Sequence, residues 1–215
     1  MTDWLATVKQ EQVIAVIRAF PKALGKQLAQ AMRQGGVRLI EITWNSDQPE
    51  QLIPELRAEM PDCIVGTGTI LNEAELNRAI ALGSQFVFTP HVNPKLIATA
   101  NAHNIPIIAG ALSPTEIITA WQAGSTAVKV FPAQSVGGVN YIKSLQGPLG
   151  NIPLIPTGGV TLENAPAFIE AGAIAVGLSS QLFPQSLIHA ENWDAITKRA
   201  WTLKQTLYTA SNPKN

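Results

Sequence analysis

The sequence predicts an α/β fold, a single (β/α)8 TIM barrel that forms one domain over residues 1–215. Short β-branched or apolar segments alternate with longer segments of helical periodicity, and this order is typical of a parallel sheet covered by helices. Eight strand candidates occur, and eight such units close most naturally into a barrel. A glycine that recurs at comparable intervals supports a repeated unit. No linker, low-complexity tract or change of composition divides the chain.

The predicted strands are short runs rich in β-branched and apolar residues. They are Val13–Arg18, Leu39–Asn45, Ile64–Ile70, Phe86–Pro90, Ile105–Ala109, Ala127–Phe131, Pro153–Gly159 and Ala175–Ser180. Between them, apolar residues return every three or four positions, as on the buried face of a helix. A doubly wound open sheet is the alternative, but it usually has about five or six such units, and no G-x-G-x-x-G follows the first strand.

Four glycines mark the expected ends of helices. They are Gly36, Gly83, Gly124 and Gly172, each three residues before an even-numbered strand. Glycine readily adopts the left-handed conformation that ends a helix and turns the chain toward the next strand. The intervals of 47, 41 and 48 residues therefore indicate a repeated double βα unit.

Composition excludes several classes of protein. Fifteen basic and fifteen acidic residues cancel, with no block of like charge, so we expect no nucleic-acid partner and no membrane partner. No window approaches the roughly 18 consecutive apolar residues of a membrane helix. Cys63 is the single cysteine, and no signal pattern opens the chain. These features indicate a cytoplasmic protein. If it binds an anionic ligand, a local binding site must provide the attraction, because the overall charge is balanced.

Lys129 lies in the middle of the apolar run 127–131. A charged side chain is costly in a buried strand unless it has a partner or a purpose. Desolvation of a lysine favours the neutral amine, which is the form that attacks a ketone to give a Schiff base. A buried ion pair, or a lysine whose amine reaches water at the strand end, is the alternative. Lys129 is therefore the candidate nucleophile.

Glu41 is the candidate proton carrier. Alternate residues of a barrel strand point inward, so Lys129 shares its face with Phe131 and Glu41 shares its face with Thr43. Even-numbered strands contribute to the same interior layers, which brings Glu41 toward Lys129. An acid beside an amine suits the repeated proton transfers of Schiff-base chemistry, and a structural ion pair is the alternative interpretation.

Two loops of small residues predict an anion site. Gly158 and Gly159 end the seventh strand and lead into a helix that we expect to start near Thr161. Exposed amides and a helix N-terminus favour an anion there, although a tight turn explains a glycine pair equally well. Ser179 and Ser180 supply the matching loop after strand 8, where barrels often bind phosphate.

Arg18 stands at the mouth of the first strand, where its guanidinium can hold a carboxylate bidentately. An ordinary surface arginine is the alternative. No His pairs with Asp or Glu at the spacing of metal ligands, so we expect no metal and no other cofactor.

Together these segments resemble the class I aldolases that cleave 2-keto-3-deoxy-6-phosphogluconate and 2-keto-4-hydroxyglutarate. The resemblance covers nearly the whole chain and is carried by residues 15–19, 35–43, 65–69, 89–91, 128–133 and 156–160. It implies a compact (β/α)8 barrel that assembles as a homotrimer, with the Schiff-base lysine at Lys129 and the acid/base glutamate at Glu41. The same resemblance implies a pyruvate pocket lined by Thr69, Pro90 and Phe131, with Thr157 nearby.

The implied reaction is reversible cleavage of a phosphorylated 2-keto-3-deoxy sugar acid to pyruvate and glyceraldehyde 3-phosphate, as in the Entner–Doudoroff pathway. One alternative is a 4-hydroxy-2-oxoglutarate aldolase that gives pyruvate and glyoxylate. The other is a barrel that binds a phosphosugar or keto acid without turnover.

The sequence departs from the family pattern at two positions. Some members carry an arginine four residues after the glutamate to hold the keto-acid carboxylate, and Asn45 stands there instead, so Arg18 could take over this role. Ser179 replaces the second glycine of a frequent Gly-x-Gly-Ser loop. The pair formed by Asn45 and Ser46 looks closer to the branch that acts on the galactonate epimer.

Overall fold

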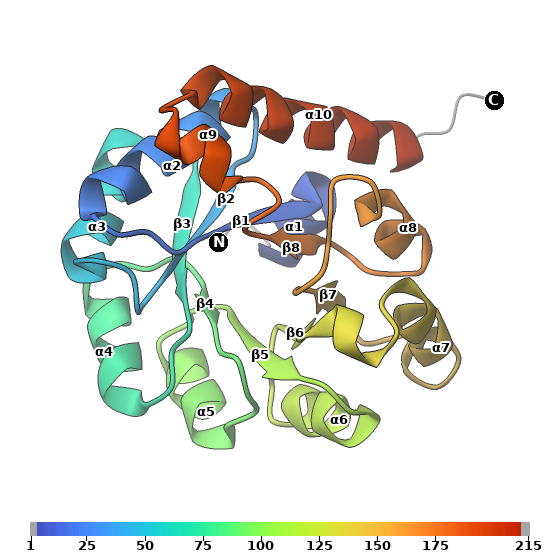
Figure 1. Ribbon diagram of the computed structural model, residues 1–215. Helices are drawn as coiled ribbons and strands as arrows, with labels where there is room; N and C mark the ends of the chain where they lie inside the picture. Colours follow the sequence, from blue (N-terminus) through green and yellow to red (C-terminus); the bar gives the residue numbers. More distant parts are fainter. Residues whose placement is uncertain (1–3, 212–215) are drawn as a thin grey trace.

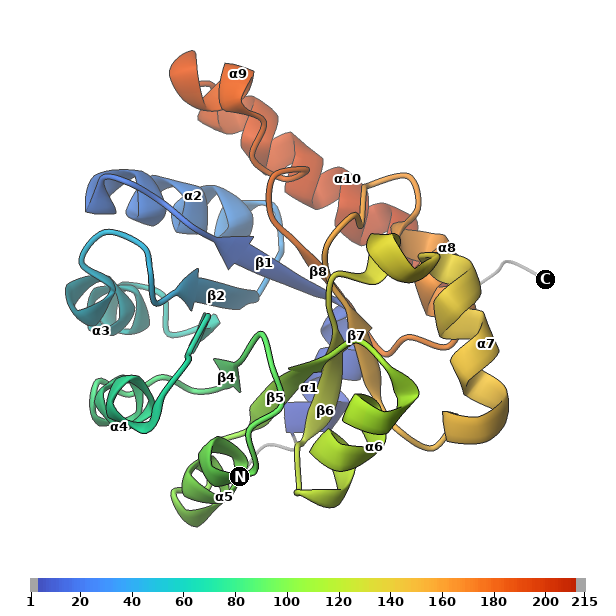
Figure 2. The same ribbon diagram turned by 60° about the horizontal axis from the view of Figure 1, so that its bottom comes forward.

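The computed structural model describes residues 4–211 and shows eight parallel strands that form a barrel inside a ring of helices (Figure 1; Figure 2). The strands are β1 (Val13–Ile17), β2 (Leu39–Thr43), β3 (Ile64–Gly68), β4 (Val87–Phe88), β5 (Ile107–Ala111), β6 (Ala127–Val130), β7 (Leu154–Pro156) and β8 (Val176–Leu178). Their order is β7-β6-β5-β4-β3-β2-β1-β8. A bridge between Thr157 and Gly177 joins the two ends of this series. The predicted TIM barrel is therefore confirmed.

The helices alternate with the strands and cover the outside of the barrel (Figure 2). They are α1 (Trp4–Glu11), α2 (Lys22–Gln34), α3 (Pro49–Glu59), α4 (Glu73–Ala81), α5 (Pro94–Ala102), α6 (Pro114–Gln122), α7 (Val139–Leu149), α8 (Ala165–Glu170), α9 (Gln185–His189) and α10 (Trp193–Ser211), with a 3-10 turn, η1 (Ala133–Val136). None of the helices between residues 4 and 211 has the length and apolar character needed to cross a bilayer. The predicted domain limits include both chain ends, which lie outside the described residues, so those limits stay a prediction.

The hydrophobic core has two layers, which follow from the alternation of side chains along each strand. Val128 and Val130 belong to the outer layer, between the strands and the helices. Ala127 belongs to the inner layer, which fills the barrel. Trp4 of α1, the helix that precedes β1, packs against that inner layer, and the centre of its ring lies 5.8 Å from that of Phe86. The inward and outward faces predicted for the sixth strand are therefore confirmed.

Several predicted boundaries are wrong. Every strand except the fifth ends one to three residues earlier than predicted, and the fifth ends two residues later. The fifth strand starts at Ile107 and not at Ile105, because the Ile105 amide donates to the Ala100 carbonyl at the end of α5. The helix after the glycine pair starts at Ala165 and not near Thr161. Thr161 and Asn164 exchange hydrogen bonds between their side chains and amides, and this turn delays the helix.

The repeated glycines end their helices as predicted. Gly36, Gly83, Gly124 and Gly172 have φ values of +84°, +83°, +94° and +103°. At Gly36, the glycine amide donates to the Arg33 carbonyl and the next amide, of Val37, donates to the Met32 carbonyl. This pair of bonds is the Schellman motif, and each of the other three glycines forms the same pair. The four equivalent turns confirm the repeated unit.

We expect Gly36→Ala to lower the free energy of unfolding by about 1–2 kcal/mol, because an L side chain is strained at positive φ. A Cβ atom at Gly36 would meet nothing within 4 Å, so backbone strain alone is tested. Gly36→Asn is the matched control, since asparagine tolerates this conformation better. Urea unfolding of the three proteins measures the effect, and equal losses for Ala and Asn would contradict the assignment.

Candidate active site

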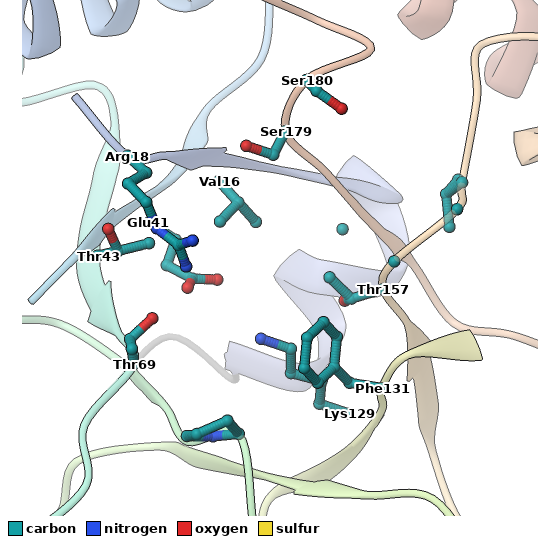
Figure 3. A pocket seen from close by; sticks show the side chains of 15 residues that line it. Val16, Arg18, Glu41, Thr43, Thr69, Lys129, Phe131, Thr157, Ser179 and Ser180 are labelled. Atoms are coloured by element: carbon teal, nitrogen blue, oxygen red, sulfur yellow. The ribbon is translucent and has the colours of Figure 1, made fainter. Parts of the chain in front are cut away.

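A cavity of about 460 Å3 opens at the carboxyl end of the barrel strands (Figure 3). Its lining comes from the ends of strands or from the loops that follow them, on both the even and the odd strands. The lining residues are Val16, Arg18, Glu41, Thr43, Thr69, Pro90, Lys129, Phe131, Thr157, Gly158, Gly159, Val160, Gly177, Ser179 and Ser180. Active sites of TIM barrels lie at this end.

Every predicted site residue except Asn45 lines this cavity. Asn45 is exposed in the turn after β2, outside the lining, and Thr43 is the residue of this segment that joins Glu41 there. Val16 and Gly177 were not predicted, although alternation along their strands would have found both. Val160 was also missed, because it follows the glycine pair in a loop that has no periodic signal.

Lys129 is held over two aromatic rings. Its side chain extends from β6, which is paired on both sides, and only 6% of the residue is exposed. The Nζ atom lies 5.5 Å from the ring centre of Phe88 and 4.9 Å from that of Phe131. Aromatic faces attract a cationic group through the ring quadrupole. The amine therefore lies inside the cavity that Glu41 also lines, and none of the ion pairs found between residues 4 and 211 involves it.

Glu41 is a buried carboxyl without a hydrogen bond. The residue is 1% exposed, and neither carboxyl oxygen has a hydrogen-bond partner. Burial raises the pKa of Glu41 above its ordinary value, and the positive charges of Lys129 and Arg18 oppose this rise without cancelling it. Figure 3 shows the carboxyl group on the wall of the cavity beside the Arg18 guanidinium. A carboxyl with a raised pKa can donate and accept a proton near neutral pH.

Gly68 makes room for this carboxyl group. It ends β3, next to β2, and a Cβ atom placed on it would overlap Oε1 of Glu41. Its φ lies outside the left-handed region, so the backbone itself does not require glycine. The steric requirement therefore comes from Glu41.

Arg18 is exposed at the mouth of the cavity. None of the ion pairs formed within residues 4–211 involves its guanidinium. Thr69 follows β3 on the same side of the cavity (Figure 3) and has a φ of +62°, which is strained for a β-branched residue. Of the non-glycine residues with positive φ between residues 4 and 211, Thr69 is the one that lines the cavity.

The glycine pair and the two serines line the other side of the cavity. Gly158 and Gly159 have φ values of +87° and +84°, and a Cβ atom on Gly159 would overlap the Gln134 side chain. The 3-10 turn η1 supports this loop, since the Gln134 amide donates to the Gly158 carbonyl over 3.0 Å. Ser179 and Ser180 are exposed on the facing loop. The anion site at these residues stays a prediction, and the expected helix N-terminus lies farther along the chain.

The groups that line the cavity are suited to covalent and acid/base chemistry on a carbonyl substrate. Around one cavity the fold places an amine, a carboxyl group of raised pKa, an exposed guanidinium and a loop of small residues, which are the groups that Schiff-base chemistry on an anionic substrate needs. Within the described part of the chain, no group of three or more His, Cys, Asp or Glu side chains is arranged to hold a metal ion.

Comparison with known proteins identifies relatives over most of the chain. The family described as KDPG and KHG aldolase matches residues 5–199. A 2-dehydro-3-deoxy-phosphogluconate aldolase of Haemophilus influenzae is 36% identical over 169 residues, which are 79% of this chain and 80% of the relative. A 2-dehydro-3-deoxy-6-phosphogalactonate aldolase of Escherichia coli is 33% identical over 173 residues, which are 80% of this chain and 84% of the relative.

Solved structures of aldolases also resemble this chain over most of its length. The KDPG aldolase of Legionella pneumophila, with pyruvate captured at low pH as a covalent carbinolamine intermediate, superposes with a TM-score of 0.85 and 26% identity, covering 93% of this chain and 97% of that one. A cube-shaped protein cage designed by fusing symmetric oligomeric domains gives a TM-score of 0.85 and 28% identity, covering 93% of this chain and 73% of that one. The chain belongs to the KDPG and KHG aldolase family.

Proposed function

We propose that this aldolase works through a Schiff base and cleaves a phosphorylated 2-keto-3-deoxy sugar acid reversibly to pyruvate and glyceraldehyde 3-phosphate. The observation that carries the proposal is the pair of buried groups in one cavity, the amine of Lys129 and the carboxyl of Glu41. The names of the relatives from Haemophilus influenzae and Escherichia coli support this substrate class. The covalent pyruvate intermediate of the Legionella pneumophila enzyme supports the mechanism.

The neutral amine of Lys129 attacks C2 of the keto acid and forms a carbinolamine. Glu41 donates a proton to the carbinolamine hydroxyl, water leaves, and an iminium remains. The Glu41 carboxylate then removes the proton of the C4 hydroxyl, the C3–C4 bond breaks, and its electron pair moves to the iminium to give an enamine. The aldehyde leaves. Protonation of the enamine at C3 and hydrolysis of the resulting imine release pyruvate and restore the amine.

The remaining cavity residues bind the two ends of the substrate in this proposal. Arg18 binds the carboxylate, because its guanidinium is exposed at the cavity mouth and takes part in none of the ion pairs of residues 4–211. The pyruvate part contacts Thr69, Pro90, Phe131 and Thr157, and the phosphate contacts Gly158, Gly159, Ser179 and Ser180. Asn45 needs a movement of the turn after β2 to reach the substrate. The steps require no metal and no cofactor.

We also propose that the chain is a cytoplasmic homotrimer. The family resemblance supports the trimer, and a structural relative was designed by fusing symmetric oligomeric domains. Sedimentation equilibrium tests this directly, with an expected mass of three times the 23.0-kDa chain.

The substrate is tested by pyruvate release from the 6-phosphorylated keto acid and from the same acid without phosphate. We expect kcat/KM to fall about 10²-fold without phosphate, because two or more charge-assisted hydrogen bonds are lost. Lys129→Ala should release no pyruvate above background. A small effect of the phosphate would favour the 4-hydroxy-2-oxoglutarate reaction, and binding without any turnover by the wild type would favour a non-catalytic barrel. Both C4 epimers are compared in parallel.

We expect Glu41→Gln to lower kcat roughly 10²- to 10⁴-fold and yet to raise stability at neutral pH. Burial raises the pKa of Glu41 in the folded state, so its contribution to stability is present below the ordinary carboxyl pKa and is lost as the pH rises through the raised value. Glutamine cannot ionise and avoids that loss. Urea unfolding from pH 4 to pH 8 measures the difference, which should grow with pH; a constant difference would contradict the assignment.

Gly68→Ala should lower kcat and move the pH dependence of kcat, because the methyl group displaces the Glu41 carboxyl. Gly66→Ala is the matched control, since Gly66 lies two residues earlier in β3, opposite Glu41 in the strand register, and a Cβ atom there would overlap Phe86, which does not line the cavity, and not the Glu41 carboxyl. Both variants should lose stability. Equal loss of kcat in the two variants would show that the effect comes from the strand and not from Glu41.

A further inference from the structure

The turn after β2 holds the segment that carries Arg18. Ser46 is 7% exposed, and its hydroxyl lies 3.0 Å from the hydroxyl of Thr43. The same Ser46 Oγ accepts a hydrogen bond from the Ala19 amide over 3.3 Å and donates to the Ile17 carbonyl over 3.4 Å. One buried hydroxyl therefore bonds the backbone immediately before and immediately after Arg18.

Asp47 adds two bonds to the same segment. Its amide donates to the Ala19 carbonyl over 2.9 Å, and its Oδ2 accepts from the Lys22 amide over 2.8 Å. Lys22 is the first residue of α2, and Pro21 before it provides no side-chain cap. The Asp47 carboxylate therefore caps α2 from a different loop, at the helix end where a negative charge is favourable.

These contacts fix the backbone on both sides of Arg18 and leave its side chain free. Ala19 is buried, and both its amide and its carbonyl are bonded, whereas the Arg18 guanidinium is exposed at the cavity mouth. Holding the backbone in advance removes part of the conformational entropy that binding would otherwise cost. The turn that carries Asn45 therefore affects the cavity indirectly, because Ser46 and Asp47 hold the backbone on both sides of Arg18.

We propose that Ser46 and Asp47 are positioning residues for Arg18, which they hold in the geometry that binds the carboxylate of the keto acid. The proposal rests on the carboxylate-binding role of Arg18 in the proposed function. It assigns the contribution of this turn to substrate affinity, that is, to KM and not to the bond-breaking step.

The test uses exchange of the pyruvate methyl protons with solvent, because pyruvate carries the carboxylate without a phosphate. Ser46→Ala should raise KM for pyruvate about tenfold, with kcat for exchange within about twofold of wild type. Asp47→Asn keeps its amide and should raise KM about threefold. This milder variant keeps the test usable if Ser46→Ala does not fold.

Ser125→Ala is the matched control. Ser125 is 2% exposed and bonds three backbone groups, those of Ile107, Ala109 and Ala127, which do not line the cavity. It should lose as much stability as Ser46→Ala and keep KM. If both serine variants leave KM unchanged while Arg18→Ala raises it, the positioning role is wrong and the proposed function stands.

Arg18→Ala distinguishes the carboxylate-binding role of Arg18 from the positioning role of Ser46 and Asp47. We expect it to raise KM for pyruvate by more than tenfold, and addition of Ser46→Ala to this variant should raise KM no further. If Arg18→Ala leaves KM unchanged, the carboxylate role of Arg18 fails, and the positioning role fails with it.

Discussion

The burial of an amine and a carboxyl at one end of the barrel interior is the constraint on which the structure depends. Each charge costs several kcal/mol to remove from water unless it is paired and hydrogen-bonded. Glu41 has no hydrogen bond, and Lys129 faces aromatic rings. The fold must therefore supply the missing stability elsewhere, and the inner and outer apolar layers do so. In the proposed mechanism, both groups thereby stay available for proton transfer and covalent bonding.

Glycines leave the space that several cavity-lining groups occupy. Glu41 leans over Gly68, and Thr157 leans over Gly177, so a Cβ atom on either glycine would overlap its neighbour. Gly110 allows the backbone of Pro90 to approach in the same way. Because adjacent strands are paired in fixed register, these glycines help to set the positions of Glu41, Thr157 and Pro90. Rigid placement of this kind keeps a reacting centre close to its productive geometry.

Most of the fold and most of the cavity could be predicted from local patterns. Alternation along β6 gave the inward face of Lys129, and the glycines before the even strands gave the repeated unit. Long-range contacts leave no such pattern. Nothing in the spacing of Ser46 and Ala19 reveals that they bond across two loops, and the turn that keeps Asn45 out of the lining is set by those same contacts. The delayed start of α8 also depends on side-chain bonds within one turn.

The central claim is that Lys129 forms a Schiff base with the keto acid. Borohydride reduction in the presence of pyruvate, followed by intact mass and peptide mapping, tests it most directly on the wild type and on Lys129→Ala. We predict one reduced pyruvate adduct, located on the peptide that contains Lys129 and absent from the variant. An unmodified wild-type protein, at a pyruvate concentration where binding is demonstrated independently, would contradict the account.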